Sequence, residues 1–289
     1  MHPILFHLPI LDKPVYSYGT LLGLSCVLGA HLAVYLSERS GIEARKAWWF
    51  ALSVIVLGVV GGRIHELWVQ GKLFTSALFQ LEHSGRTAYG GFIFGTLGGI
   101  AAARLLKVPF WRFADAVAPT LALGLGLTRI GCFLYGCDYG IRSDAWGVRF
   151  PPGSPAAQDH LEAGLVQLLP DGSAPPSLPV FPAQLLASAV GLALFAFLLW
   201  FWFRRPRREG SVFLLFGCLY GLARAGLEQL RSDVGRGELL GLSTSTTIGL
   251  FTAAACLLLL CVPALARWRA EAREILPPPA RDSATKATA

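Results

Sequence analysis

Seven stretches of the chain are apolar for long enough to cross a membrane as helices. The hydrocarbon core of a bilayer is about 30 Å thick, which takes roughly 20 helical residues. The stretches lack the strict alternation of barrel strands, and only helices or closed barrels satisfy their backbone groups in lipid. The pattern therefore predicts seven transmembrane helices, near residues 18–37, 47–68, 89–106, 115–135, 184–203, 211–230 and 243–265.

The composition narrows the class of protein further. Of the 289 residues, 54% are apolar and 15% are charged, whereas soluble domains carry about 25% charged residues. The net charge is +7, but the Lys and Arg residues lie between apolar stretches and form no basic face, so no nucleic-acid partner is expected. Six cysteines without a CxxC pair predict neither a disulfide scaffold nor a zinc site, and no metal or cofactor is expected.

Lys and Arg in the loops predict the orientation. One set of alternate loops, together with the tail, holds 15 of these residues, and the opposite set holds 7. Since cytoplasmic loops carry the excess, we expect the N-terminus outside and the C-terminus in the cytoplasm. The leader contains Asp12 and Lys13 but no basic n-region or small-residue cleavage site, so the first stretch is expected to remain as a helix.

The resulting organisation is an all-α polytopic membrane protein with a small periplasmic cap domain. The expected segments are a periplasmic amphipathic arm at 1–17, four helices within 18–137, a periplasmic head at 138–181, three helices within 182–268 and a disordered cytoplasmic tail at 269–289. The head is rich in Pro, Gly and Ser, and no internal repeat is visible.

Four charged residues lie within or at the ends of apolar stretches: Arg63, Arg129, Arg224 and Glu228. Charge at such positions is costly and marks a candidate functional site. The predicted topology places all four in the outer third of outward-running helices, where three cations and one carboxylate suit an anion such as a phosphate. The alternative is that each Arg snorkels to the interface and pairs with lipid phosphate generically.

Other polar residues near the same level leave their roles open. Arg224, Glu228 and Arg231 are spaced to share one helix face, which fits a ligand site or a local ion-pair ladder. His65 is a candidate base or a hydrogen-bonded structural residue. Cys132 and Cys137 are a candidate redox pair, or two small packing residues.

The order of short motifs resembles the prolipoprotein diacylglyceryl transferase family. The matching residues are Tyr18-Gly19, Gly61-Gly62-Arg63, Gly90-Gly91, Asp115 to Pro119, Gly124, Gly126, Arg129-Ile130-Gly131, Phe133, Gly136, Gly140, Pro182, Gln184-Leu185, Tyr220-Gly221, Arg224, Glu228 and Arg231. The stretch around Arg129 is the most specific, and the match runs from Tyr18 to Leu250.

The chain departs from this family pattern where acid and base residues are usual. Tyr89 stands in place of a His before the Gly-Gly pair, and Cys132 and Cys137 replace an Asn and a Glu. Phe181 and Ala187 occupy the ends of a motif that usually begins with His and ends with Glu. The arginine set is kept while the acid/base set is altered, so either a variant active site or a paralogue with a changed reaction is expected.

The resemblance implies transfer of the diacylglyceryl group of phosphatidylglycerol to the lipobox cysteine of a prolipoprotein signal peptide, in the bacterial inner membrane. On that basis Tyr89, Arg129, Arg224 and Glu228 are the expected catalytic residues. Arg63, Tyr18, Gln184 and Arg231 are the expected substrate-binding residues. Arg129 and Arg224 are assigned to the phosphate, and Tyr89 lies where the family places its base.

Because the unperturbed pKa of Tyr is about 10, we favour activation of the substrate thiol by nearby arginines over proton abstraction by Tyr89. Two other functions remain as alternatives. One is a paralogue that uses phospholipid headgroups with another acceptor. The other is a non-enzymatic anion or lipid transporter, although transporters often show inverted repeats.

Overall fold

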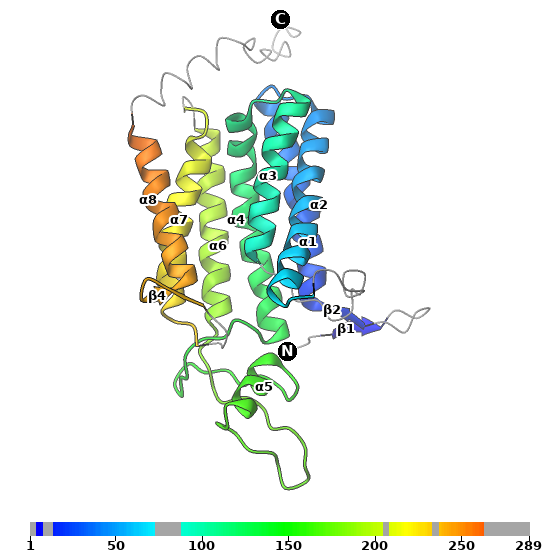
Figure 1. Cartoon of the computed structure of the whole chain (residues 1–289), viewed down its shortest axis with the longest axis vertical. Coiled ribbons are helices and arrows are strands. Elements are labelled where there is room, and N and C mark those ends of the chain that lie inside the picture. The colour runs from blue at the N-terminus through cyan, green and yellow to red at the C-terminus, as the bar shows by residue number, and fades with distance from the viewer. Residues whose placement is uncertain (1–3, 8–13, 73–87, 205–207, 233–236, 263–289) are drawn as a thin grey trace, which may run out of the picture. The chain divides into compact units, whose positions relative to one another are not determined.

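A computed structural model describes residues 4–7, 14–72, 88–204, 208–232 and 237–262 of the chain. Within that part the chain is mainly helical (Figure 1). The long helices are α1 (Ser17–Arg39), α2 (Ala44–Val69), α3 (Ala88–Leu106), α4 (Phe110–Tyr135), α6 (Ala183–Phe203), α7 (Ser211–Glu228) and α8 (Thr244–Cys261). All but α3 are long and apolar enough to span a membrane, and α3 contains a shorter apolar helix, Gly90–Leu106. The protein is therefore a multi-pass membrane protein.

The helices follow the apolar stretches closely, with two differences at their ends. Helix α4 begins at Phe110, five residues before the expected start, so Arg112 belongs to the helix instead of the preceding loop. Helix α7 ends at Glu228. The expectation that Arg231 shares a helix face with Arg224 and Glu228 is therefore wrong, because Arg231 lies beyond the helix.

Among the described residues, four short strands accompany the helices. Strands β1 (Ile4–His7) and β2 (Pro14–Tyr16) pair antiparallel within the segment expected to form the N-terminal arm. Strands β3 (Glu238–Leu239) and β4 (Leu242–Ser243) form a second antiparallel pair that leads into α8. The expected tail at 269–289 lies outside the described residues.

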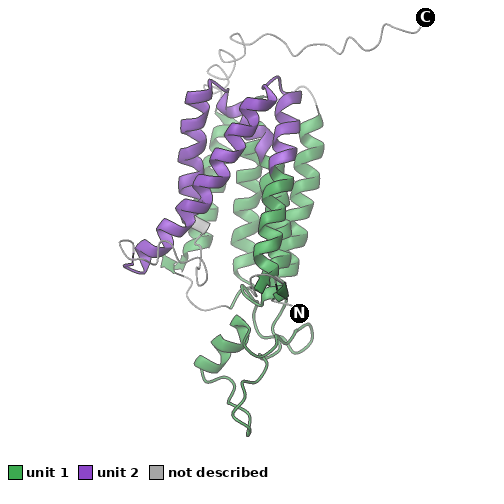
Figure 2. Cartoon of the chain, turned by 90° about the vertical axis from the view of Figure 1, so that its right-hand side faces the viewer, with its two compact units in different colours: residues 1–29, 118–265 green, residues 30–117, 266–289 purple. Residues whose placement is uncertain are grey.

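The chain divides into two compact units that interleave in sequence (Figure 2). One unit comprises residues 30–117 and 266–289. Its core gathers apolar side chains of α1, α2, α3 and the start of α4, among them Phe50 and Phe113, whose rings lie 3.8 Å apart. Helices α2 and α3 approach closely at glycines: a Cβ atom on Gly90 would come within 2.5 Å of the Cβ of His65. Small residues allow this approach between membrane helices.

The other unit comprises residues 1–29 and 118–265. Within it α4 packs on α1, where a Cβ on Gly131 would lie 3.1 Å from the Cα of Tyr18. On another side α4 packs on α6, where Gly126 and Gly191 face each other. Helices α7 and α8 meet at Gly221 and Gly249. The glycines bring these backbones together, so polar side chains near the same helix ends converge.

The segment between α4 and α6 folds around a small core of its own. Helix α5 (Pro155–Glu162) is capped by Ser154, whose hydroxyl accepts a hydrogen bond from Ala157 N–H, as N-cap residues do. The core joins Tyr139, Phe150, Ala156 and Val180 with Phe133 of α4. This segment lies below the helices α4, α6, α7 and α8 in the view of Figure 1, at the end where α4 stops and α6 begins. Its first residues form part of the site described next.

Candidate functional site

The end of α4 turns the chain back toward the helix. Gly136 adopts φ +90° and Asp138 adopts φ +57°, both in the left-handed region that usually favours glycine. The turn places the Asp138 carboxylate against Arg129, with 2.6 Å between Nη1 and Oδ2. The turn at Gly136 therefore lets two side chains that are nine residues apart in sequence form a direct ion pair.

Arg231, which is 93 residues after Asp138 in the sequence, contacts the same carboxylate. The backbone of Tyr139 to Ile141 runs antiparallel to that of Leu230 to Ser232, with Ile141 N–H donating to Leu230 C=O at 2.9 Å and Ser232 N–H donating to Tyr139 C=O at 3.2 Å. This short pairing brings the Arg231 guanidinium onto Oδ1 of Asp138. Asp138 therefore accepts from one arginine on each of its two oxygens.

A second carboxylate holds the arginine of α7. Glu228 is 2% exposed and lies one helical turn after Arg224, with 2.8 Å between Arg224 Nη2 and Glu228 Oε2. Arg224 also donates to the hydroxyl of Ser245 in the first turn of α8, at 3.0 Å. The i,i+4 spacing makes this pair a local consequence of helix formation, and Ser245 ties it to the neighbouring helix.

The two arrangements join into one series of alternating charges. Arg231 Nη1 lies 3.9 Å from Glu228 Oε2, so the order runs Arg129, Asp138, Arg231, Glu228, Arg224. We call these five residues the ion-pair chain. Three guanidinium groups against two carboxylates leave one positive charge in excess, which an anion with a single negative charge would balance.

The two ends of the ion-pair chain line one small cavity between α4, α6 and α7. Its walls are Leu125, Arg129, Ala187, Val190, Gly191, Tyr220, Arg224 and Leu227. Five of the eight are aliphatic side chains or glycine, and the polar groups are the two guanidiniums and the Tyr220 phenol. Arg129 of α4 and Arg224 of α7 thus both line this cavity. The cavity has room for about one water molecule, with a volume of about 20 Å³, and the two guanidiniums and the phenol converge on it.

Asp138 stays ionised in this setting. Burial by itself would raise the pKa of its carboxyl, but the Arg129 and Arg231 guanidiniums outweigh that effect and lower the pKa below its usual value. Opposite charges at hydrogen-bond distance favour the charged form of a carboxyl. Asp138 therefore remains a carboxylate between its two arginines.

Two further expected residues lie close to this chain. Tyr18 of α1 lies within electrostatic reach of Asp138 and Arg129. Gln184, in the first turn of α6 and 1% exposed, donates from Nε2 to the carbonyl of Cys137 at 2.7 Å. Its Oε1 is buried and has no hydrogen-bond partner among the described residues, which leaves a buried acceptor near the turn that carries Asp138.

The remaining expected residues belong to the other compact unit. Arg63 and His65 lie on α2, and the His65 ring contacts Trp68 edge-on at 5.9 Å. Tyr89 lies on α3, but its side chain is outside the described residues. The structure therefore brings together Arg129, Arg224, Glu228, Arg231, Tyr18 and Gln184.

Sequence reasoning missed two members of the site. Asp138 lies two residues after Gly136 at a helix end, a position that by itself predicts only a turn. Tyr220 lies four residues before Arg224 on α7, so the i,i+4 rule was a usable signal that it faces the same side. Its place in the cavity wall makes it the one polar group there besides the arginines.

The fold and the site define a polytopic membrane protein with an arginine-lined cavity beside an ion-pair chain. The family model for prolipoprotein diacylglyceryl transferase matches residues 3–262, and the chain belongs to this family. It is 30% identical over 246 residues to phosphatidylglycerol–prolipoprotein diacylglyceryl transferase 2 of Clostridium perfringens, covering 84% of this chain and 88% of that protein. The enzyme of the same name, without the number, from Mannheimia succiniciproducens is 32% identical over 239 residues, covering 77% and 81%.

Proposed function

We propose that this protein transfers the diacylglyceryl group of phosphatidylglycerol to the lipobox cysteine of prolipoproteins. Family membership and the names of the relatives support the reaction. The observation that carries the site assignment is that Arg129 and Arg224, from different helices, line one cavity. The single excess positive charge of the ion-pair chain matches the single negative charge of a phosphodiester.

In this mechanism Arg129 and Arg224 hold the lipid phosphate. The sulfur–carbon bond forms at the terminal glycerol carbon of the diacylglyceryl group while the bond from that carbon to the phosphate oxygen breaks. The electron pair leaves on the phosphate, giving glycerol-1-phosphate, and guanidiniums aimed at this developing charge lower the barrier. The same cations favour the thiolate form of the acceptor, which is the nucleophile.

The other residues position these groups. Glu228 orients Arg224, and Asp138 orients Arg129 and Arg231. Gln184 offers its unpaired carbonyl oxygen to a hydroxyl of the glycerol headgroup, and Tyr18 and Arg231 complete the binding surface. Tyr89 occupies the position of the family's base, but activation of the substrate thiol is assigned to the arginines.

The setting we propose is the bacterial inner membrane. Seven spans, counting α3, would put the two termini on opposite sides, and the excess of Lys and Arg in alternate loops supports an N-terminus outside and a C-terminus in the cytoplasm. Residues 138–181 then form a periplasmic head and residues 1–17 a periplasmic arm. The ion-pair chain faces the outer leaflet, where lipid and lipobox peptide meet.

The experiment is a transfer assay in liposomes containing phosphatidylglycerol and a lipobox peptide. The wild type should add a diacylglyceryl group to the peptide, measured by mass. Arg129→Ala and Arg224→Ala should each reduce the rate about 100-fold or more, as loss of a charge-stabilising donor does. Arg142→Ala, which removes an exposed arginine, is the matched control. Unchanged peptide in the presence of the wild type contradicts the reaction, and full activity of Arg129→Ala contradicts the phosphate assignment.

A second candidate is a transferase that uses the same headgroup with another acceptor. It is favoured by the altered acid/base positions, Tyr89, Cys132, Cys137, Phe181 and Ala187. Labelled phosphatidylglycerol should then release glycerol phosphate when other thiol or hydroxyl acceptors replace the lipobox peptide. Release that depends strictly on the lipobox peptide eliminates this candidate.

A further inference from the structure

Two cysteines meet at the end of α4, beside the ion-pair chain. Cys132 lies in the last turn of the helix, and Cys137 follows the positive-φ Gly136. The N–H of Cys137 donates to the carbonyl of Cys132 at 3.2 Å. This is the 6→1 hydrogen bond of a Schellman-type helix end, in which the side chains at these two positions commonly touch. The helix-ending motif therefore brings two thiols to a place where an apolar contact is usual.

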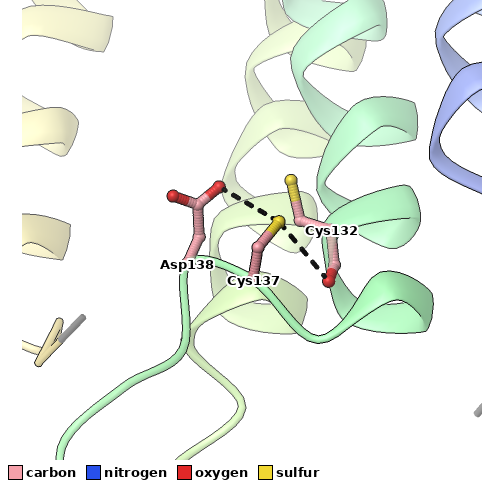
Figure 3. Close-up of side chains that lie close together, drawn as sticks. All are labelled: Cys132, Cys137 and Asp138. Carbon is pink, nitrogen blue, oxygen red and sulfur yellow. Dashed lines mark hydrogen bonds between the residues drawn. The ribbon is translucent and has the colours of Figure 1, made fainter. Parts of the chain in front are cut away.

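The side chains are close enough to react with little rearrangement. Both are thiols in the structure, and their sulfur atoms and an Asp138 oxygen all lie within 4.8 Å of one another. Figure 3 shows the Cys137 sulfur between the Asp138 carboxylate and Cys132. A disulfide needs the two sulfur atoms about 2.05 Å apart, so the side chains must approach each other further.

The neighbouring charges argue against a metal at this cluster. A cation bound by the two sulfurs and Asp138 would need a free carboxylate oxygen, but Oδ2 accepts from Arg129 and Oδ1 from Arg231. The Arg129 guanidinium also lies 4.0 Å from the Cys132 sulfur. A metal ion would therefore sit against fixed positive charge, whereas a neutral disulfide would not.

We propose that Cys132 and Cys137 form a reversible disulfide that locks the turn carrying Asp138. Cys137 is half-buried and Cys132 is 4% exposed, so Cys137 meets an incoming oxidant first. Its thiolate attacks the disulfide of an external thiol–disulfide exchange partner, and one thiol of that partner leaves. Cys132 then attacks the mixed disulfide and the second thiol leaves. The protein loses two protons and two electrons, which the partner gains.

The bond would act on the site through Asp138. The turn is now held by backbone hydrogen bonds and by Gln184, which donates to the carbonyl of Cys137. A covalent bond from Cys137 to the helix keeps the next residue, Asp138, against Arg129 even when those bonds open. A disulfide stabilises chiefly by limiting the open states of the chain it closes, so the oxidised protein should hold its arginines more firmly.

The test counts free thiols in the purified full-length protein. The folded protein is treated with oxidised glutathione, then denatured and alkylated with a maleimide, and its mass is measured. We expect four adducts without reductant and six after reduction, because the chain has six cysteines. Peptide mapping should place the bond between Cys132 and Cys137, and the melting temperature of the oxidised protein should exceed that of the reduced protein.

Variants separate this pair from the other thiols. Cys132→Ser lacks the thiol that resolves the mixed disulfide, so Cys137 should keep one glutathione; the variant should give four maleimide adducts without reductant and five after reduction, with no internal disulfide. Cys26→Ser, the matched control on α1, should give three adducts without reductant and five with it. Six adducts after oxidation overturn the proposal. So does a bond mapped to Cys218 and Cys256, or bound zinc that is present in the wild type and absent from Cys132→Ser. None of these readouts depends on transfer activity.

Discussion

The two carboxylates of the ion-pair chain hold their arginines in opposite ways. Glu228 pairs with Arg224 one turn earlier on the same helix, so the pair forms whenever α7 is helical. Asp138 joins Arg129, nine residues before it, to Arg231, 93 residues after it. That junction exists only when the end of α4 and the residues after α7 have come together. The Glu228 half of the ion-pair chain therefore forms within one helix, whereas the Asp138 half forms only when distant segments of the protein pack together.

The difference shows where the site is vulnerable. A pair within one helix is kept when that helix moves slightly against its neighbours. A carboxylate shared between two distant arginines loses one of its ion pairs when the segments that carry them move apart. The Asp138 side chain is also 27% exposed, whereas Glu228 is 2% exposed. Solvent and partner motion therefore act on the Asp138 half first, and the predictions below separate the two halves.

The largest effect should come from Asp138→Asn. This change leaves Arg129 and Arg231 without their shared carboxylate, and removing one partner of a largely desolvated ion pair costs about 3 kcal/mol. Unfolding of the purified protein in detergent should show this loss, and the transfer rate should fall with it. Asp144→Asn removes a carboxylate from an exposed pair with Arg142 and should change the stability by less than about 1 kcal/mol. Equal effects of the two variants would contradict the role of Asp138.

Glu228→Gln should cost less, about 2 kcal/mol, because Arg224 keeps its hydrogen bond to Ser245 and the new amide still accepts one. Glu43→Gln, in an exposed pair with Arg45, is the control and should be near neutral. The double variant Asp138→Asn/Glu228→Gln should lose more than the sum of the single variants, because Arg231 approaches both carboxylates and would then face two neutral side chains. Strict additivity would show that the two halves are independent.

Acid should break the Asp138 half reversibly. The folded-state pKa of Asp138 lies below its ordinary value, so its stabilisation is present above the unfolded carboxyl pKa, about 3.9, and is lost as the pH falls through the folded value. The melting temperature of the wild type should therefore drop below about pH 4, and the drop should be smaller in Asp138→Asn. The same acid dependence in both proteins would assign the effect to other carboxyls.

The smallest effect should come from Ser245→Ala. Arg224 loses one hydroxyl acceptor but keeps Glu228, so the stability should fall by about 1 kcal/mol or less. When it is combined with Glu228→Gln, Ser245→Ala should lower the stability by more than it does alone, because Arg224 then faces a neutral side chain at position 228 and has lost the Ser245 hydroxyl. A thermal unfolding series of the two single variants and their combination measures this. A larger loss from Ser245→Ala than from Glu228→Gln would reverse the assignment of roles.

Much of the helical framework could be predicted from the sequence. The seven apolar stretches match seven long helices, because a run of about 20 apolar residues has few other ways to satisfy its backbone in lipid. Boundaries were less certain: Arg231 was placed on the face of α7 although the helix ends at Glu228. Helix ends depend on capping and on the partners of the next residues, which a period of 3.6 does not encode.

Parts of the site were predictable for the same reason. Charged residues in apolar stretches attract attention because each needs a partner, and this signal found Arg129, Arg224 and Glu228. It passed over Asp138, which lies in a polar turn where a carboxylate is ordinary, and Tyr220, whose amphipathic side chain is common in membrane helices. The sequence around Asp138 and Tyr220 shows no free-energy penalty that would demand a partner, so their contacts become visible only in the folded structure.

The sequence alone determined the apolar spans, the turn glycine after α4 and the i,i+4 pair of Arg224 and Glu228, since each depends on residues within one or two helical turns. Only the tertiary structure decided that Asp138 binds two arginines, that Arg129 and Arg224 share a cavity, and that Cys132 and Cys137 lie beside them. These contacts join segments by backbone pairing and by close approach at glycines. These contacts depend on how distant segments pack in the folded protein, so no pattern within a short stretch of sequence specifies them.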